Sequence, residues 1–254
     1  MLLGREDGMS GTVRIVRKKK KFIFWQSFFF IFVALMAGYV LLQSPIFSIT
    51  KITVQGNNNM TAGEIVRVSG IVTGMNIFKA DLQTASTKVK ALPMVKEVNI
   101  TRDFPDTISI DVIEREPVVL VVVDEHFVEL DAEGYFLRTG SAAATGLPVV
   151  TGIQVQSAGP GKKVTGKGLD VALKVVQELT EQLRNNLSEV SVNNVGLVTL
   201  YTLDGIECRL GMPENVNVKG DYFLQVIEEL QEGNKNIEYV DFSIVNSPVV
   251  KYRD

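Results

Sequence analysis

The chain has 254 residues, of which 26 are Lys or Arg and 29 are Asp or Glu, so its net charge is −3 at pH 7. Residues 43–254 carry 19 basic and 27 acidic side chains, a net charge of −8. This acidic balance excludes a nucleic-acid partner, which requires clustered Lys and Arg. A single cysteine excludes an intramolecular disulfide, and with a single histidine it argues against a zinc site.

Residues 22–42 form an uncharged, apolar segment behind a short basic tail. Thirteen of these 21 residues are Phe, Ile, Val or Leu. A helix of this length, at ~1.5 Å per residue, spans about 30 Å, which is the thickness of a bilayer's hydrocarbon core. A cleaved signal peptide is the alternative, but its apolar region is shorter and ends in a small-x-small pattern, whereas Leu35 stands two residues before Ala37. The sequence predicts a transmembrane helix over 22–42.

The residues before this segment predict its orientation. Four of them, Lys18, Lys19, Lys20 and Lys21, stand directly in front of it, and residues 1–21 contain seven Lys or Arg against two acids. Because positive flanks stay in the cytoplasm, we expect residues 1–21 to be a cytoplasmic tail. Everything after the helix then lies outside the cytoplasm.

The next segment predicts a strand followed by two helices. Residues 47–54 alternate apolar and polar side chains, as a strand with one buried face does. Thr61 stands three residues before Glu64, the spacing of a capping box, so a short helix begins there. We expect a second helix, capped by Asn76 or Asp81, to end before residue 93, which is a proline.

A hairpin completes this unit. Residues 95–100 and 108–112 alternate in the same way on either side of the turn Phe104-Pro105-Asp106. The order strand, helix, helix, strand, strand predicts a small α+β layer in which two helices cover one face of a three-stranded sheet.

Five phrases within this unit resemble a known family. They are VQGN at 54–57, GMNIF at 74–78, LPMV at 92–95, FPDTI at 104–108 and VIEREP at 112–117. Their order and spacing resemble a POTRA domain of the FtsQ/DivIB cell-division type, over residues 47–117. Behind one membrane anchor, five phrases in register are a specific match.

Residues 118–254 predict a β-rich domain with two amphipathic helices. The run 118–123 is apolar, and 127–131 faces 135–137 across a turn. Apolar residues recur at helical spacing over 169–183 and 218–230. The further strands expected are 190–192, 198–203, 205–210 and a last strand at 237–245, with a short segment at 248–252 closing the chain. The phrases LPVVTG at 147–152 and Asp241-Phe242 also resemble the second domain of the same family.

No catalytic constellation emerges from the sequence, and we expect no cofactor and no small-molecule substrate. His126 lies in a predicted turn, and neighbouring acids such as Glu228 and Glu229 do not face each other on a helix. Gly159–Lys163 lacks the spacing of a phosphate-binding loop. Cys208 lies in an apolar-flanked stretch, so we expect a buried strand residue.

The resemblance implies a scaffold of the bacterial division machinery, held in the cell membrane at the septum. In this family the terminal strand binds FtsL-like and FtsB/DivIC-like single-pass proteins. The positions that correspond to this contact are Ser243, Ile244, Val245 and Asn246, although the family often has an aromatic residue where this chain has Ile244. Because edge strands offer unpaired N–H and C=O groups, we expect binding by addition of a strand. A paired inner strand at 237–245 is the alternative.

Two other classes of function stay open at this level. An anchored enzyme acting on cell-wall material would need a cleft with paired acids. A POTRA-bearing chaperone of outer-membrane assembly would need tandem POTRA repeats or a β-barrel, and neither pattern is visible.

Overall fold

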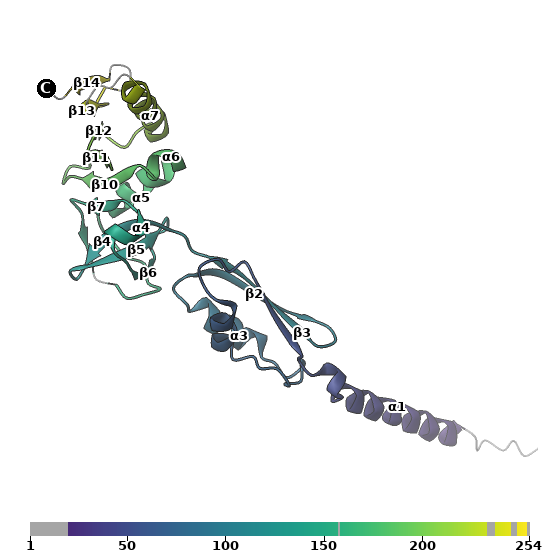
Figure 1. The fold of residues 1–254 in the computed structure, drawn as a ribbon. Coiled ribbons are helices and arrows are strands. Elements are labelled where there is room, and N and C mark those ends of the chain that lie inside the picture. The colour runs from purple at the N-terminus through teal and green to yellow at the C-terminus, as the bar shows by residue number, and fades with distance from the viewer. Residues whose placement is uncertain (1–19, 157, 233–236, 245–247, 253–254) are drawn as a thin grey trace, which may run out of the picture.

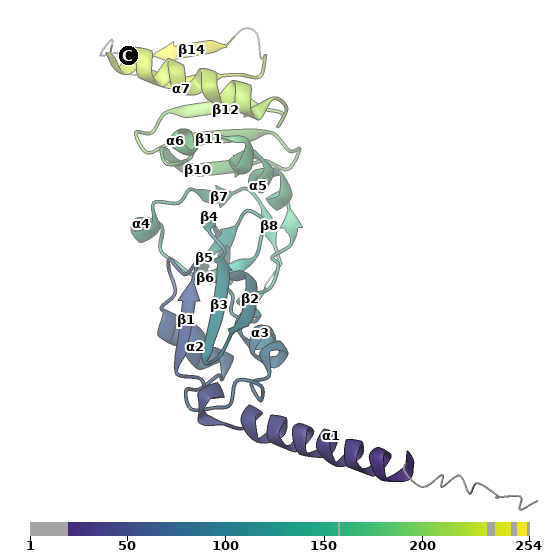
Figure 2. The same ribbon diagram turned by 90° about the vertical axis from the view of Figure 1, so that its right-hand side faces the viewer.

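The computed structural model describes residues 20–156, 158–232, 237–244 and 248–252 (Figure 1). Helix α1 (Lys20–Leu42) projects away from the rest of the molecule, and no residue of its apolar span Phe24–Leu42 is buried (Figures 1 and 2). A long apolar helix without a protein partner needs lipid around it. Among the described residues, α1 is the one helix that is long and apolar enough to cross a membrane. Lys18 and Lys19 lie outside the described residues, and Lys20 and Lys21 are the first two residues of α1.

The first domain has the predicted order of elements. They are β1 (Lys51–Gln55), α2 (Ala62–Ser69), α3 (Leu82–Lys90), β2 (Val95–Asp103) and β3 (Thr107–Glu114). The sheet order is β1-β3-β2, with β1 parallel and β2 antiparallel to the central strand. Both helices cover one face, and a core of Ile65, Ala85, Val89, Ile108 and Ile110 lies between the layers.

Both helices of this domain begin at capping side chains. The Thr61 hydroxyl accepts a hydrogen bond from the Glu64 amide at 3.3 Å, as the capping-box spacing predicts. Of the two candidates for the second cap, Asp81 is the one used, because its Oδ1 accepts from the Thr84 amide at 3.1 Å. Asn76 instead donates from Nδ2 to the carbonyl oxygen of Leu42 at 2.8 Å, which ties the domain to the last turn of α1.

The second domain contains one nine-stranded sheet in the order β14-β13-β12-β11-β10-β7-β4-β5-β6. Its strands are β4 (Pro117–Val123), β5 (His126–Asp131), β6 (Phe136–Thr139), β7 (Val149–Thr151), β10 (Leu187–Val192), β11 (Val198–Thr202), β12 (Glu207–Gly211), β13 (Ile237–Asp241) and β14 (Val249–Tyr252). A separate pair, β8 (Gln154–Val155) and β9 (Gly166–Lys167), lies beside it. The α+β class predicted from the sequence is confirmed.

Helices gather on one side of this sheet (Figure 1). They are α5 (Leu169–Glu178), α6 (Glu181–Arg184) and α7 (Val216–Glu232), while the short α4 (Ala142–Thr145) precedes β7. The buried faces of α5 and α7 contact β4, β10 and β12. The helices and the inner sheet face enclose one hydrophobic core that is separate from the core of the first domain.

The single helix expected over 169–183 is two helices. The chain becomes extended at Leu179, and Thr180 then caps α6 by accepting from the Leu183 amide at 3.4 Å. Apolar spacing did not reveal the break, because Leu179 and Leu183 are both buried and continue the same stripe.

Glu114, the last residue of β3, closes the first domain. Its buried carboxylate accepts hydrogen bonds from the amides of Asn58 at 3.1 Å, Asn59 at 2.7 Å and Met60 at 2.9 Å. Burial raises the pKa of Glu114, but the amides of Asn59 and Met60 outweigh burial, so its pKa lies below the ordinary value. The charged carboxylate therefore holds the loop between β1 and α2.

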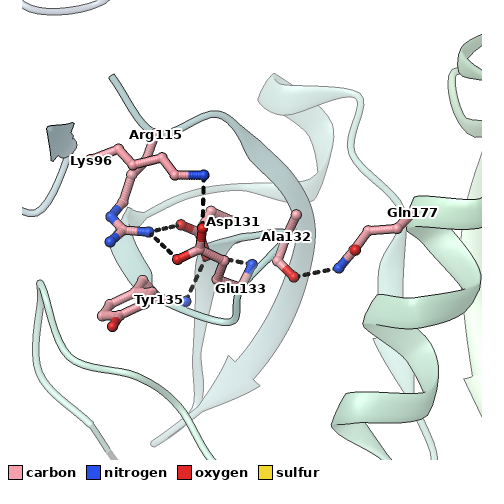
Figure 3. Close-up of polar contacts among 7 residues, drawn as sticks. All are labelled: Lys96, Arg115, Asp131, Ala132, Glu133, Tyr135 and Gln177. Carbon is pink, nitrogen blue, oxygen red and sulfur yellow. Dashed lines mark hydrogen bonds and ion pairs between the residues drawn. The ribbon is translucent and has the colours of Figure 1, made fainter. Parts of the chain in front are cut away.

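Arg115, the next residue, joins the two domains (Figure 3). Its Nη1 pairs with Asp131, the last residue of β5, and at 3.2 Å with Glu133 in the turn that follows. Its guanidinium lies 3.8 Å from the ring centroid of Tyr135. Lys96 of β2 adds a second ion pair across the junction, 2.7 Å from Glu133. Glu133 thus meets cations from β2 and from the end of β3.

The turn that receives Arg115 is itself held in place. Asp131 Oδ1 accepts from the amides of Glu133 at 2.9 Å and Tyr135 at 2.8 Å. The Gln177 side chain of α5 donates to the Ala132 carbonyl at 2.5 Å (Figure 3). Since the side chains of Arg115 and Asp131 are only 10% and 7% exposed, their pairing is sheltered from solvent.

We predict that Glu114→Gln lowers the free energy of unfolding of the first domain by about 2 kcal/mol, because a charged acceptor of backbone amides is lost. The pKa of Glu114 is lower in the folded protein than its ordinary value of 4.5. The carboxylate therefore stabilises the folded protein fully above pH 4.5, and this stabilisation is lost as the pH falls through the folded pKa. Urea titration of residues 43–254 at neutral and acidic pH measures both effects. The deficit of the variant should shrink in acid, and Glu97→Gln, at an exposed position of β2, serves as the control.

We predict that Arg115→Ala loosens the contact between the two domains and lowers the free energy of unfolding by about 2 to 3 kcal/mol, because Asp131 is left without its cation. Small-angle X-ray scattering should then report a broader distribution of interdomain distances. Lys174→Ala removes an exposed ion pair within α5. It should change neither the free energy of unfolding nor the distribution of interdomain distances. Identical scattering from the Arg115 variant and the unchanged chain would contradict a role of this side chain in the junction.

Candidate partner-binding site

The strand expected to present a free edge is an inner strand. β13 lies between β12, to which it is parallel, and β14, to which it is antiparallel. It also ends at Asp241 and does not continue to residue 245. The prediction of a free edge at 237–245 is therefore wrong. The physical reason is that the segment after it, expected only to close the chain, pairs with β13 and takes the outer position.

The four predicted contact residues follow β13 in the chain. Ser243 and Ile244 lie in a turn, where the Ser243 amide donates to Asp241 Oδ1 at 2.8 Å. Burial raises the pKa of Asp241, but the hydrogen bonds from Ser243 outweigh burial and lower it. Ile244 is 69% exposed, and Val245 and Asn246 lie outside the described residues. The turn therefore displays an exposed apolar side chain next to the outer strand.

β14 is the outermost strand at one end of the nine-stranded sheet. The strand at the other end, β6, is bonded at its first residue, Phe136, to the loop at 159–163. In that loop the backbone carbonyl of Lys162 accepts a hydrogen bond from the Phe136 amide at 2.9 Å, and the Gly161 amide donates to the Phe136 carbonyl at 2.8 Å. Within the part of the chain that the structure describes, no strand pairs with the outer side of β14. β14 is thus the margin of this sheet at which a strand can be added.

The two faces of β14 differ in character. Val250 packs on the hydrophobic core, whereas Val249 on the other face is 58% exposed. On that outer face Lys251 pairs with Glu238 at 2.8 Å and lies 5.7 Å from the ring centroid of Tyr239. A strand beside β14 would meet backbone groups, the exposed side chains of Val249 and Tyr252, and the ion pair of Lys251 with Glu238.

Buried side chains support this end of the sheet. Phe223 of α7 and Phe242, directly after β13, meet edge to face at 6.3 Å, and both are fully buried. Lys219 of α7 is also buried and donates to the carbonyls of Leu210 at 2.7 Å and Met212 at 2.9 Å. Burial lowers the pKa of Lys219. The end of β12 is therefore bound to α7, and β13 pairs with this anchored strand.

The residues considered for catalysis do not converge. His126 is exposed at the start of β5, with Nδ1 2.7 Å from the Asp124 carbonyl oxygen. Cys208 is fully buried in β12, and burial raises the pKa of its thiol. Within the described ranges, no group of three or more His, Cys, Asp or Glu side chains is placed to hold a metal ion. The loop at 159–163, considered for phosphate binding, is bonded to the first residue of β6.

An apolar N-terminal helix, a POTRA-like layer and a nine-stranded sheet define a class of membrane-anchored proteins with two further domains. Comparison with known families agrees with this architecture. Residues 47–115 match the POTRA domain, FtsQ-type, and residues 119–243 match the C-terminal domain of cell division protein FtsQ/DivIB. The chain belongs to the FtsQ/DivIB family of bacterial cell division proteins.

Relatives of the same family align along most of the chain. The cell division protein FtsQ of Syntrophotalea carbinolica is 30% identical over 224 residues, which cover 86% of this chain and 79% of that protein. DivIB of Clostridium botulinum strain Hall is 27% identical, and the match covers 92% of this chain and 93% of that protein. DivIB of Staphylococcus aureus strain NCTC 8325 is 24% identical, and the match covers 84% of this chain and 48% of that protein.

A solved structure of the major extracytoplasmic domain of DivIB from Geobacillus stearothermophilus, described as the trans isomer, also aligns. The match covers 47% of this chain and 96% of that domain, at 17% identity and a TM-score of 0.33.

We predict that Cys208 does not react with a thiol reagent in the folded protein, because a buried thiol with a raised pKa supplies almost no thiolate. Labelling with iodoacetamide at mildly alkaline pH should be complete in guanidinium chloride and negligible without it. Rapid labelling of the folded chain would show that β12 is accessible and would contradict the packing of this end of the sheet.

Proposed function

We propose that this chain is a non-enzymatic scaffold of the division machinery that binds FtsL-like and FtsB/DivIC-like subunits outside the cytoplasm during septum formation. Residues 1–21 stay in the cytoplasm, and the protein is enriched at the septum. The observation that carries the proposal is the open margin of β14 at the end of the sheet. Family membership supports the role in division.

Strand addition at β14 explains how a surface without a deep cleft can hold a partner. An added strand gains a row of backbone hydrogen bonds, and exposed side chains beside it supply selectivity. Ile244, Val249 and Tyr252 are large hydrophobic side chains that are exposed in this part of the chain. The proposed contact therefore comprises β14 together with the predicted contact residues Ser243, Ile244, Val245 and Asn246.

We propose a non-enzymatic role because of where the buried ionisable side chains lie. The buried ionisable side chains of Glu114, Asp131 and Lys219 hold loops and strand ends. Glu129, 2% exposed, pairs with Arg138 at 2.9 Å. None of these groups faces another across a cleft that is lined for a substrate, which supports a binding role.

We predict that proline at position 250 or 251 separates folding from binding. Successive N–H groups of a strand point to opposite sides, so one of Val250→Pro and Lys251→Pro removes a bond to β13 and the other removes only an outward donor. The outward variant should keep the melting temperature and lose at least about tenfold in partner co-purification, since several backbone bonds depend on continuous pairing. The measurement is co-purification of the full-length chain with co-expressed FtsL-like and FtsB-like subunits.

Lys251→Ala is the matched control, because it keeps the backbone donor and removes only an exposed side chain. It should co-purify like the unchanged chain. If both proline variants retained the partners, strand addition at β14 would be excluded.

A further inference from the structure

An exposed apolar surface lies in the part of the first domain that is bound to the end of α1. We call it the juxtamembrane patch, and it comprises Ile46, Phe47, Phe78 and Phe104. Ile46 is 61%, Phe78 42% and Phe104 59% exposed. The rings of Phe47 and Phe78 are 5.1 Å apart between centroids, and those of Phe78 and Phe104 are 5.3 Å apart. Three aromatic rings from distant parts of the chain thus form one continuous surface.

The patch is attached directly to the membrane helix. The short 3₁₀ helix Pro45–Phe47 follows α1 after two residues. The Asn76 side chain donates to the Leu42 carbonyl at 2.8 Å, and the Ile77 amide donates to the Phe47 carbonyl at 2.8 Å. The segment that carries Phe78 is therefore bound both to the end of α1 and to the chain that leaves it.

Length limits how far the patch can stand from the bilayer. Ile46 follows Leu42 by four residues, which reach at most ~14 Å when fully extended, and the 3₁₀ turn shortens this reach. The headgroup layer on each side of a bilayer is about 5 to 8 Å thick. With Leu42 at the hydrocarbon boundary, the patch lies at the level of the headgroups, where amphipathic helices also place Trp, Phe and Leu.

Charge is distributed in a way that allows this contact. Residues 47–115 carry 8 basic and 7 acidic side chains, a net charge of +1, whereas residues 116–254 carry 11 and 20, a net charge of −9. Anionic headgroups therefore repel the second domain and leave the first domain free to approach. The second domain lies at the far end of the molecule from α1 (Figure 2).

We propose that the juxtamembrane patch inserts its exposed rings into the headgroup layer of the bilayer that α1 spans. The lipid surface is the occupant, and α1 supplies the local concentration that makes a small patch sufficient. The contact fixes how the first domain stands on the membrane. It does not depend on any protein partner, so it can hold whether or not β14 binds a strand.

A single-tryptophan form of the full-length chain tests this directly. Trp25 is the only tryptophan, so Trp25→Phe combined with Phe104→Trp leaves one reporter in the patch. The control carries Trp25→Phe with Val195→Trp, a 72% exposed position in the turn between β10 and β11. Each is reconstituted in vesicles of phosphatidylcholine and phosphatidylglycerol, with or without phosphatidylcholine brominated near the headgroup. Equal melting temperatures check that both variants fold.

The patch reporter should emit at shorter wavelength than the control. Brominated lipid should quench it at least about threefold more strongly, as interfacial aromatic residues are quenched. Emission and quenching equal to the control would overturn the proposal. Shielding that arises only when division subunits are co-reconstituted would also overturn it, because the patch would then bind protein and not lipid.

Discussion

The ion pair between Arg115 and Asp131 is the interaction on which the arrangement of the molecule depends. It joins two domains that have separate cores, and both side chains are nearly buried. Glu114 and Arg115 are consecutive, yet one closes the first domain and the other holds the second. Because successive side chains of a strand point to opposite sides, a two-residue strand end can serve both domains. The VIEREP phrase thus has a physical reason for its charges.

The other buried ionisable side chains also have structural contacts. Glu114, Glu129, Asp131 and Lys219 are each buried and paired, and each holds a loop, a strand end or a domain contact. These side chains therefore have structural roles, because each is held by hydrogen bonds or an ion pair to the group that it positions.

Local patterns predicted much of this fold, while long-range pairing stayed hidden. Alternation and the Phe104-Pro105-Asp106 turn predicted β2 and β3, and Thr61 predicted the start of α2. Break points inside a continuous apolar stripe, such as Thr180, leave no mark in periodicity. β14 has only four residues, and its pairing with β13 spans the turn after Asp241, so the sequence alone did not place it at the sheet margin. The proposed contact therefore includes residues 249–252 as well as 243–246, and the Val-Val-Lys-Tyr composition of 249–252 was the one available signal in the sequence.

The order of the nine strands sets a height. From β6 to β14 there are eight steps between neighbouring strands, and at ~4.8 Å each they place the open margin about 38 Å beyond the junction of the domains. Figures 1 and 2 show this stacking running away from α1. An α-helix rising ~1.5 Å per residue needs about 25 residues to climb the same interval. In the proposed complex, a subunit anchored in the same bilayer needs an extramembrane helix of at least that length before its pairing segment begins, so the proposed binding mode selects partners by their length as well as by their sequence.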